Sequence, residues 1–261
     1  MSNKSGGLGQ SLARIAPPLG LFAAVALLWE FGVKAANTPA YLLPAPSVIA
    51  NEMWQRSDQL LSNLGATLVA AVLGFALGTA IAILLAVLFL YSKVAEKALF
   101  PWAIILKTIP IIAIAPLLTI WLGTGLGPKV AIGALICFFP TLVNTVKGLK
   151  TVDRQAMEFL SVIGANAAQV FWHARLFAAL PYVFAAAKIS ISMSVVGAIV
   201  AEFTGANVGI GTIITTAGYQ MDAKMLFAAI VTSSIATVSL FYLVSLAEKL
   251  CLYWPEARLA A

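Results

Sequence analysis

The side chains that could carry out catalysis are few in this 261-residue chain. Its one histidine, His173, cannot form a metal site by itself and has no nucleophile near it in the sequence. The two cysteines, Cys137 and Cys251, lie in different apolar segments and in no metal-binding pattern, so we expect free thiols. The chain has no phosphate-binding loop of the G-x-x-x-x-G-K-[ST] type. The sequence therefore predicts neither an enzyme nor a cofactor bound by this chain.

A second set of polar side chains lies within an apolar stretch. Ser190 and Ser194 are four residues apart, so they share a helix face, and Glu202 follows near the end of the stretch. Polar groups inside a membrane are costly and tend to face a cavity or a partner, which makes these residues candidates for a pathway or gate. Two alternatives stay open: serine hydroxyls often bond back to their own helix, and Glu202 could be a solvated acid at the membrane surface.

The composition indicates a membrane protein. Hydrophobic residues make up 61% of the chain and charged residues only 10%, with a mean hydropathy of +0.98. Soluble domains carry about 25% charged residues. An ordinary soluble enzyme, a disordered chain and a nucleic-acid-binding protein are therefore excluded. The expected fold class is all-α, a polytopic membrane protein with about six transmembrane helices of about 20 residues each.

The stretches without charge place the six expected spans in one transmembrane domain, 19–247. Pro181 should open the fifth span, since a helix accepts proline in its first turn. The remaining segments are an N-terminal tail 1–18, a long loop 147–180 and a C-terminal tail 248–261. The expected spans are 19–33, 64–91, 100–122, 129–146, 181–203 and 224–247.

Within the spans, prolines and glycines predict local geometry. Pro110 and Pro116 should bend the third span, and they join the candidates for the pathway or gate. Lys107 should lie near the cytoplasmic end of that span, where its side chain can reach the interface. Three small residues in the second span should let another helix approach closely: Gly65, Gly74 and Gly78.

The distribution of Lys and Arg predicts that both termini are cytoplasmic. The two tails and the loops on their side hold ten basic residues: Lys4, Arg14, Lys93, Lys97, Lys147, Lys150, Arg154, Arg175, Lys249 and Arg258. The opposite side holds four: Lys34, Arg56, Lys129 and Lys224. The net charge of +6 therefore reflects orientation in the membrane and no attraction to nucleic acid.

Two loops on the opposite side have distinct character. Residues 37–63 begin with prolines and then look helical from Ser47, whose hydroxyl could cap that helix. Residues 205–222 are rich in Gly and Thr and uncharged until Asp222. They could form a re-entrant segment at a gate, or a flexible loop.

The long cytoplasmic loop predicts two short surface helices. Met157, Leu160 and Ile163 recur at helical spacing, which indicates a helix with an apolar ridge. Gly164 can end that helix and Asn166 can cap the next. A helix that docks on a partner and a loop resting on lipid headgroups both fit this pattern.

The same loop resembles a cytoplasmic motif of the permease subunits of bacterial binding-protein-dependent type I ABC importers. The motif has a glutamate followed six residues later by a glycine, here Glu158 and Gly164, and a later Leu-Pro pair, here Leu180 and Pro181. The positions that depart from the motif are Phe159, Leu160 and Phe177.

Other segments resemble the nitrate, sulfonate, taurine and thiamine-precursor branch of that family, over roughly residues 41–254. The stretch around Glu202 is most similar to permeases for pyrimidine or riboflavin-like compounds. The matching segments are Thr108–Pro110, Ala115–Leu118, Trp121–Gly125, Phe138–Thr145, Gly197–Phe203 and Met225–Ala229.

The resemblance implies a permease fold and a set of partners in the bacterial plasma (inner) membrane. A second permease copy would complete the pathway as a homodimer, two cytoplasmic ATPase subunits would bind ATP and Mg, and a periplasmic or lipid-anchored protein would deliver a small organic or anionic solute. A coupling helix over 153–164 would contact the ATPase. Its implied contact residues are Asp153, Met157, Glu158, Leu160, Ile163 and Gly164.

Two other functions remain as alternatives. A secondary active transporter would need its own ion or proton site, such as paired intramembrane acids, and an internal repeat. The sequence shows only isolated Glu30 and Glu202 and no repeat. A membrane scaffold subunit would have no solute pathway at all.

Overall fold

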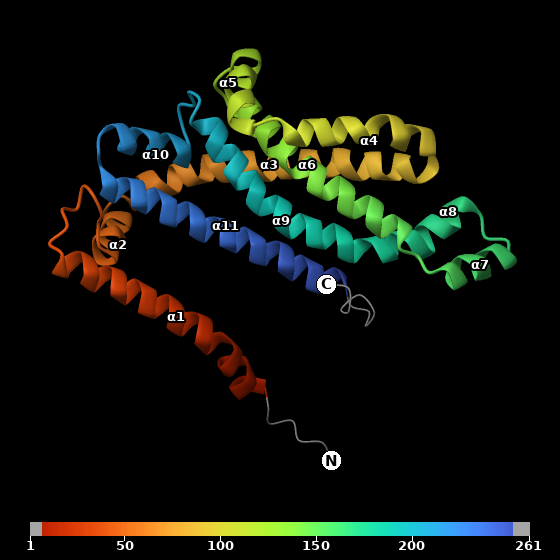
Figure 1. The fold of residues 1–261 in the computed structure, drawn as a ribbon, viewed down its shortest axis with the longest axis horizontal. Helices are drawn as coiled ribbons and strands as arrows, with labels where there is room; N and C mark the ends of the chain where they lie inside the picture. Colours follow the sequence, from red (N-terminus) through yellow and green to blue (C-terminus); the bar gives the residue numbers. More distant parts are fainter. Residues whose placement is uncertain (1–6, 253–261) are drawn as a thin grey trace.

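The computed structural model describes residues 7–252, and this part of the chain is helical without any β-strand (Figure 1). Most of the expected C-terminal tail, as well as Lys4 and Arg258, lies outside these residues. The helices are α1 Gly7–Ala35, α2 Pro46–Gln55, α3 Ser57–Tyr91, α4 Lys93–Thr108, α5 Ile111–Leu122, α6 Leu126–Lys150, α7 Arg154–Val162, α8 Ala167–Val170, α9 Leu176–Glu202, α10 Ile210–Tyr219 and α11 Ala223–Cys251, with a π-helical turn Phe171–Arg175 between α8 and α9.

Five of these helical stretches are long and apolar enough to cross a membrane, and α4 with α5 makes a sixth if the pair is one broken span. The two helices meet at an angle of 98°. The break lies at Ile109 and Pro110, as the proline predicted, whereas Pro116 lies inside an unbroken α5. Lys107 lies in the last turn of α4, beside the break. The helix begins at Lys93, before the expected start of the third span at residue 100, so Lys107 lies farther from the start of its helix than expected.

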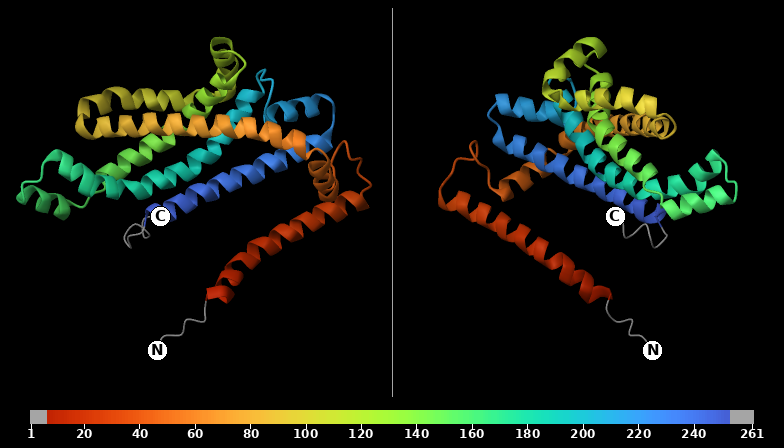
Figure 2. Two further views of the ribbon diagram at one scale, coloured as in Figure 1. Left: turned by 180° about the vertical axis from the view of Figure 1, so that it is seen from behind. Right: turned by 45° about the vertical axis from the view of Figure 1, so that its right-hand side comes forward.

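The centre of the molecule is formed by α3, α6 and α9, which lie side by side, with α11 against α9 (Figures 1 and 2). Gly74 and Gly78 allow this packing, since a Cβ atom at either position would meet the backbone of α6 within 3.0 Å. Gly65, by contrast, has open space beside it, and no other helix of the described chain packs closely against it. The first helix, α1, extends away from this centre and contacts it near its C-terminal end, where Trp29 packs on Phe227.

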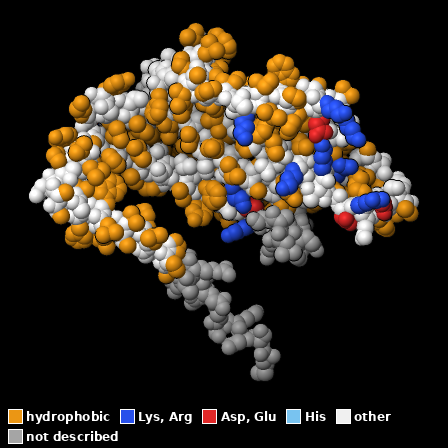
Figure 3. Space-filling view, viewed as in Figure 1, with side chains coloured by type: hydrophobic (Ala, Val, Ile, Leu, Met, Phe, Trp, Pro, Cys, Tyr) orange, Lys and Arg blue, Asp and Glu red, His pale blue; other side chains and the backbone are white. Residues whose placement is uncertain are grey.

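The two ends of the bundle differ. At one end, which we call the α7 end, lie α7, α8, the start of α4 and the end of α6, where Lys150 pairs with Glu96 at 2.6 Å. Figure 3 shows Lys and Arg side chains gathered toward this end. At the other end, the α10 end, α10 packs on α9, α11 and the first part of α3.

Three local expectations are corrected by the structure. The residue before α2 is Ala45, with Pro46 in the first turn, and Ser47 instead donates from N and Oγ to the Glu30 carboxylate at 2.9 and 2.7 Å. Pro181 lies inside α9, because the helical path already runs from Ala167. The segment 205–222 is largely α10 and is not an irregular loop.

Candidate functional site

The α7–α8 segment extends from the α7 end of the bundle (Figure 1). The chain turns at Gly164, whose φ of +71° is a left-handed conformation that favours glycine. Asn166 then caps α8: its side chain accepts from Gln169 N at 2.9 Å, and Gln169 Oε1 accepts from Asn166 N at 2.8 Å. The helix, glycine turn and cap therefore follow the pattern expected from the sequence.

The exposed apolar ridge of α7 differs from the expected one. Met157 and Leu160 are half-buried, whereas Phe159, Val162 and Ile163 are 64%, 85% and 59% exposed. Phe159 and Val162 were missed because the expected helix was oriented by an i, i+3, i+6 spacing, whereas the partly covered face of α7 carries Met157 and Leu160. A contiguous apolar ridge left in water marks a surface for a partner.

The two acidic residues of this segment remain accessible. Asp153 directly precedes α7, and its side chain makes no capping bond. Glu158 accepts from Arg154 Nε at 2.8 Å, one helical turn away, and both side chains are largely exposed. Because exposed pairs of this kind contribute little to stability, this carboxylate is available to a partner.

At the α10 end, Glu202 lies in a buried polar cluster. It is 1% exposed, which overturns the alternative of a solvated acid. Lys129 Nζ, itself 3% exposed, donates to Glu202 Oε1 at 3.0 Å and also to the carbonyl of Val208. Thr67 Oγ1 donates to the same carboxylate at 2.9 Å. A buried carboxylate so fully paired is a structural tie between α3, α6 and α9.

The cluster also binds the start of α10. Three consecutive backbone amides donate to side chains of α3 and α9: Gly209 N to Asn63 Oδ1 at 2.8 Å, Ile210 N to Thr67 Oγ1 at 2.9 Å and Gly211 N to Glu202 Oε2 at 2.7 Å. A Cβ atom at Gly209 or Gly211 would collide with the Glu202 side chain. The glycines of this segment therefore let the chain approach a buried carboxylate.

The serines of α9 face neighbouring helices. Both Ser190 and Ser194 are fully buried. Ser190 Oγ lies 3.1 Å from Thr141 Oγ1 of α6, and Ser194 Oγ donates to the carbonyl of Ala71 of α3. Each hydroxyl is therefore engaged by a neighbouring helix. Pro110 and Pro116, in contrast, lie on the exposed side of the broken span.

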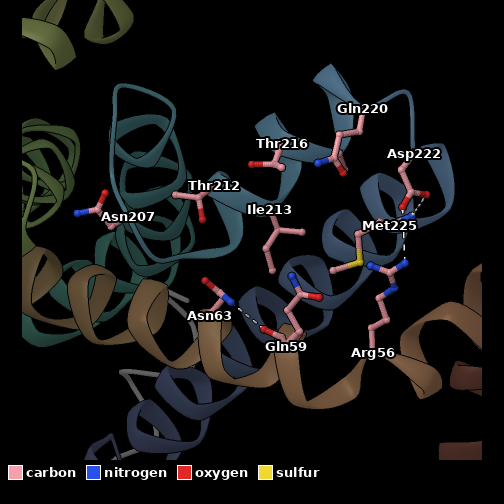
Figure 4. Close-up of a pocket in the computed structure, with 11 residues that line it drawn as sticks. Arg56, Gln59, Asn63, Asn207, Thr212, Ile213, Thr216, Gln220, Asp222 and Met225 are labelled. Carbon is pink, nitrogen blue, oxygen red and sulfur yellow. Dashed lines mark hydrogen bonds and ion pairs between the residues drawn. The ribbon is translucent and has the colours of Figure 1, made fainter.

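A polar pocket of about 240 Å³ opens at the α10 end between α3, α10 and the start of α11 (Figure 4). Amide and hydroxyl groups dominate its lining, and Arg56 lies 4.0 Å from Asp222 at one side. Such groups can hydrogen-bond a small polar molecule or the side chains of another protein. The other polar lining residues are Gln59, Asn63, Asn207, Thr212, Thr216 and Gln220.

Sequence reasoning did not assign Lys129 to this site, because it was counted among the basic residues of an outer loop. The available signal was its position at the start of an apolar stretch, where an unpaired ammonium is costly. A carboxylate partner could be expected, but the choice of Glu202 depends on how α6 packs against α9.

A family profile described as "Binding-protein-dependent transport system inner membrane component" matches residues 74–250. The chain is 35% identical to the riboflavin transport system permease protein RibX of Chloroflexus aurantiacus, over 92% of both chains. It is 33% identical to the formylaminopyrimidine transport permease protein ThiX of Halalkalibacterium halodurans, over 92% of this chain and 96% of that one. It is 29% identical to the putative aliphatic sulfonates transport permease protein SsuC of Bacillus subtilis, over 90% and 86%.

Two solved structures share the fold. One is an inward-facing form of the MetNI methionine ABC transporter, with a TM-score of 0.56, 21% identity and coverage of 80% of this chain and 97% of that chain. The other is an amino acid ABC transporter with histidines, with a TM-score of 0.57, 16% identity and coverage of 76% and 96%.

Proposed function

Since the chain belongs to the binding-protein-dependent transport system inner membrane components, as the permease subunit of a type I ABC importer, we propose that it forms a solute pathway driven by ATPase subunits docked on α7. It is a multi-pass inner-membrane protein, and in this family ATP is hydrolysed by separate subunits. The resemblance seen in the sequence is thereby confirmed, and the alternatives of a secondary transporter or a scaffold are not favoured.

The proposal of coupling to an ATPase rests on the exposed apolar ridge of Phe159, Val162 and Ile163. It lies on a helix outside the apolar bundle, next to the basic end of the molecule. An ATPase groove would cover the three apolar side chains, and Glu158 would contact its rim. The helix would be held in position by the half-buried side chains of Met157 and Leu160 and by the turn at Gly164. Asp153 would mark the start of the helix. The ATPase subunits would carry ATP and Mg.

We also propose an orientation of the protein in the membrane. The α7 end would face the cytoplasm, because basic residues concentrate there and an ATPase must be reached from that side. Both tails would then be cytoplasmic, and the polar pocket of Figure 4 would face the solute-binding protein. A second copy of the chain, forming a homodimer, would complete the pathway. Pro110 and the bend that it introduces would lie beside that pathway, with Pro116 on the adjoining α5.

The solute would be a small organic compound. The relatives named for riboflavin, formylaminopyrimidine and aliphatic sulfonates support this class. A thermal-shift screen of the cognate solute-binding protein with riboflavin, aminopyrimidines and alkanesulfonates would identify it. Only a compound that raises the melting temperature of that protein is a candidate cargo.

Co-purification tests the docking proposal. We expect the change Phe159→Asp with Val162→Asp to abolish recovery of the ATPase subunits with the full-length chain, because it places charge on the docking ridge. The control is Ser161→Asp, which adds one charge to an exposed α7 position on the helix face opposite the ridge and should retain the ATPase. Undiminished recovery with the double variant would remove the ridge from the proposal. Solute uptake by the chain alone in ATP-free proteoliposomes would contradict ATP-driven transport altogether.

A further inference from the structure

Lys107, in the last turn of α4, has no carboxylate partner among the described residues, unlike Lys129 and Lys188. Lys129 forms an ion pair with Glu202 at 3.0 Å, and Lys188 forms one with Glu248 at 2.8 Å. Lys107 of α4 lies over the ring of Phe139, 4.6 Å from its centre, and no carboxylate among residues 7–252 pairs with it. Because an ammonium group in a membrane is costly, an unpaired one indicates a functional group.

Lys107 lies in the last turn of α4, and its side chain is exposed at the surface of this chain. Its helix starts at Lys93 and runs alongside α3, away from the α7 end (Figure 1). At the rise of an α-helix the distance from Lys93 to Lys107 is about 21 Å. The hydrocarbon core of a bilayer is about 30 Å thick, so an α4 that crosses the membrane from the α7 end would place this ammonium within the core, beyond the reach of water at that end.

The ammonium borders a cavity of about 450 Å³ between α4, α5, α6 and α9, beside the break at Pro110. This volume is in the range of small-molecule sites. Two of its lining side chains are polar, Lys107 and Asn144, and the rest are apolar. The residues that define its character are Lys107, Phe139, Asn144, Ile114, Ile189 and Met193.

We propose that this cavity binds an organic anion, with the negative group against Lys107 Nζ and the apolar body against Phe139 and the aliphatic wall. The inference rests on the proposed pathway and narrows its solute to a chemical class. A fixed positive charge between apolar walls attracts an anion and repels a cation strongly, since the low local dielectric does little to screen it. The apolar wall favours a solute with a carbon body over an inorganic ion.

The charge of the cavity can be measured with a cysteine reporter in the full-length chain in membrane vesicles. Asn144→Cys is introduced with Cys137→Ala and Cys251→Ser, and Met193→Cys provides a second reporter on α9. The probes are the anionic 2-sulfonatoethyl and the cationic 2-(trimethylammonium)ethyl methanethiosulfonates, with rates normalised to a free thiol. We expect the anionic reagent to react about tenfold faster. Lys107→Gln should abolish this preference and Lys107→Arg should retain it.

Protection of the reporter tests the ligand class. Benzenesulfonate should slow modification of the Asn144→Cys variant, and benzyltrimethylammonium should not. Equal rates for both reagents, no reaction at either reporter, or equal protection by both compounds would overturn the proposal. The docking experiment on Phe159 and Val162 is independent of these rates. Loss of anion preference with docking intact therefore refutes only this site, whereas failed docking with the preference intact refutes the proposed coupling.

Discussion

Glu202 of α9 and Lys129 of α6 are 73 residues apart in the sequence and form an ion pair of 3.0 Å inside the helix bundle. Removing two charges from water costs several kcal/mol for each ion, and the pair offsets this cost only when its remaining hydrogen-bonding groups are satisfied. Here the Thr67 hydroxyl and the Gly211 amide donate further hydrogen bonds to the Glu202 carboxylate. The pair therefore fixes the relative positions of three central helices and of α10.

Breaking this pair from one side should destabilise the protein strongly. Lys129→Met leaves the Glu202 carboxylate buried without its cation, which we expect to cost about 3–5 kcal/mol. The measurement is the unfolding temperature of the detergent-solubilised full chain. Lys34→Gln is the control and should change the unfolding temperature little, because the Lys34 side chain is 63% exposed and Glu30 keeps its hydrogen bonds to Ser47. Equal effects of the two changes would show that the buried pair is not a structural tie.

The Thr67 hydroxyl should hold α10 in place. Thr67→Val keeps the shape of the side chain and removes the donor to Glu202 and the acceptor for the Ile210 amide, at a cost of about 1–3 kcal/mol. Hydrogen exchange at the start of α10 should become faster. Thr67→Ser retains the hydroxyl and should behave like the parent protein. Unchanged exchange in the valine variant would contradict this role.

The close approach of α3 and α6 should depend on Gly78. Gly78→Val places side-chain atoms into the backbone around Ala134 and should reduce the yield of monodisperse protein on size exclusion. Gly65→Val is the matched control on the same helix, because open space surrounds that position. The prediction fails if both variants give the yield of the parent protein.

The conformation of Gly164 should matter even though space is available around it. Its φ of +71° makes Gly164→Ala strained by about 1–2 kcal/mol, which should shift α7 and weaken ATPase recovery in the co-purification assay. Gly32→Ala, a glycine in open space within α1, lacks this strain and should leave recovery unchanged. Parental recovery with Gly164→Ala would mean that the turn does not position α7.

Local features of the α7–α8 segment could be predicted because they depend on neighbouring residues. The glycine turn and the Asn166 cap each follow from one residue type at one position. The exposed face of α7 could not be predicted in the same way. Spacing indicated a ridge through Met157 and Leu160, yet packing half-buries these two and exposes Phe159 and Val162.

The sequence by itself determined the all-helical membrane class, the break at Pro110 and the family, because these depend on composition, on a missing backbone donor and on motifs that are read along the chain. The partner of Glu202, the burial of Ser190 and Ser194 and the unpaired state of Lys107 were decided only by the tertiary structure. A buried charge or hydroxyl is satisfied by whatever group packing brings within hydrogen-bond distance, and that group lies on another helix, far away in the sequence.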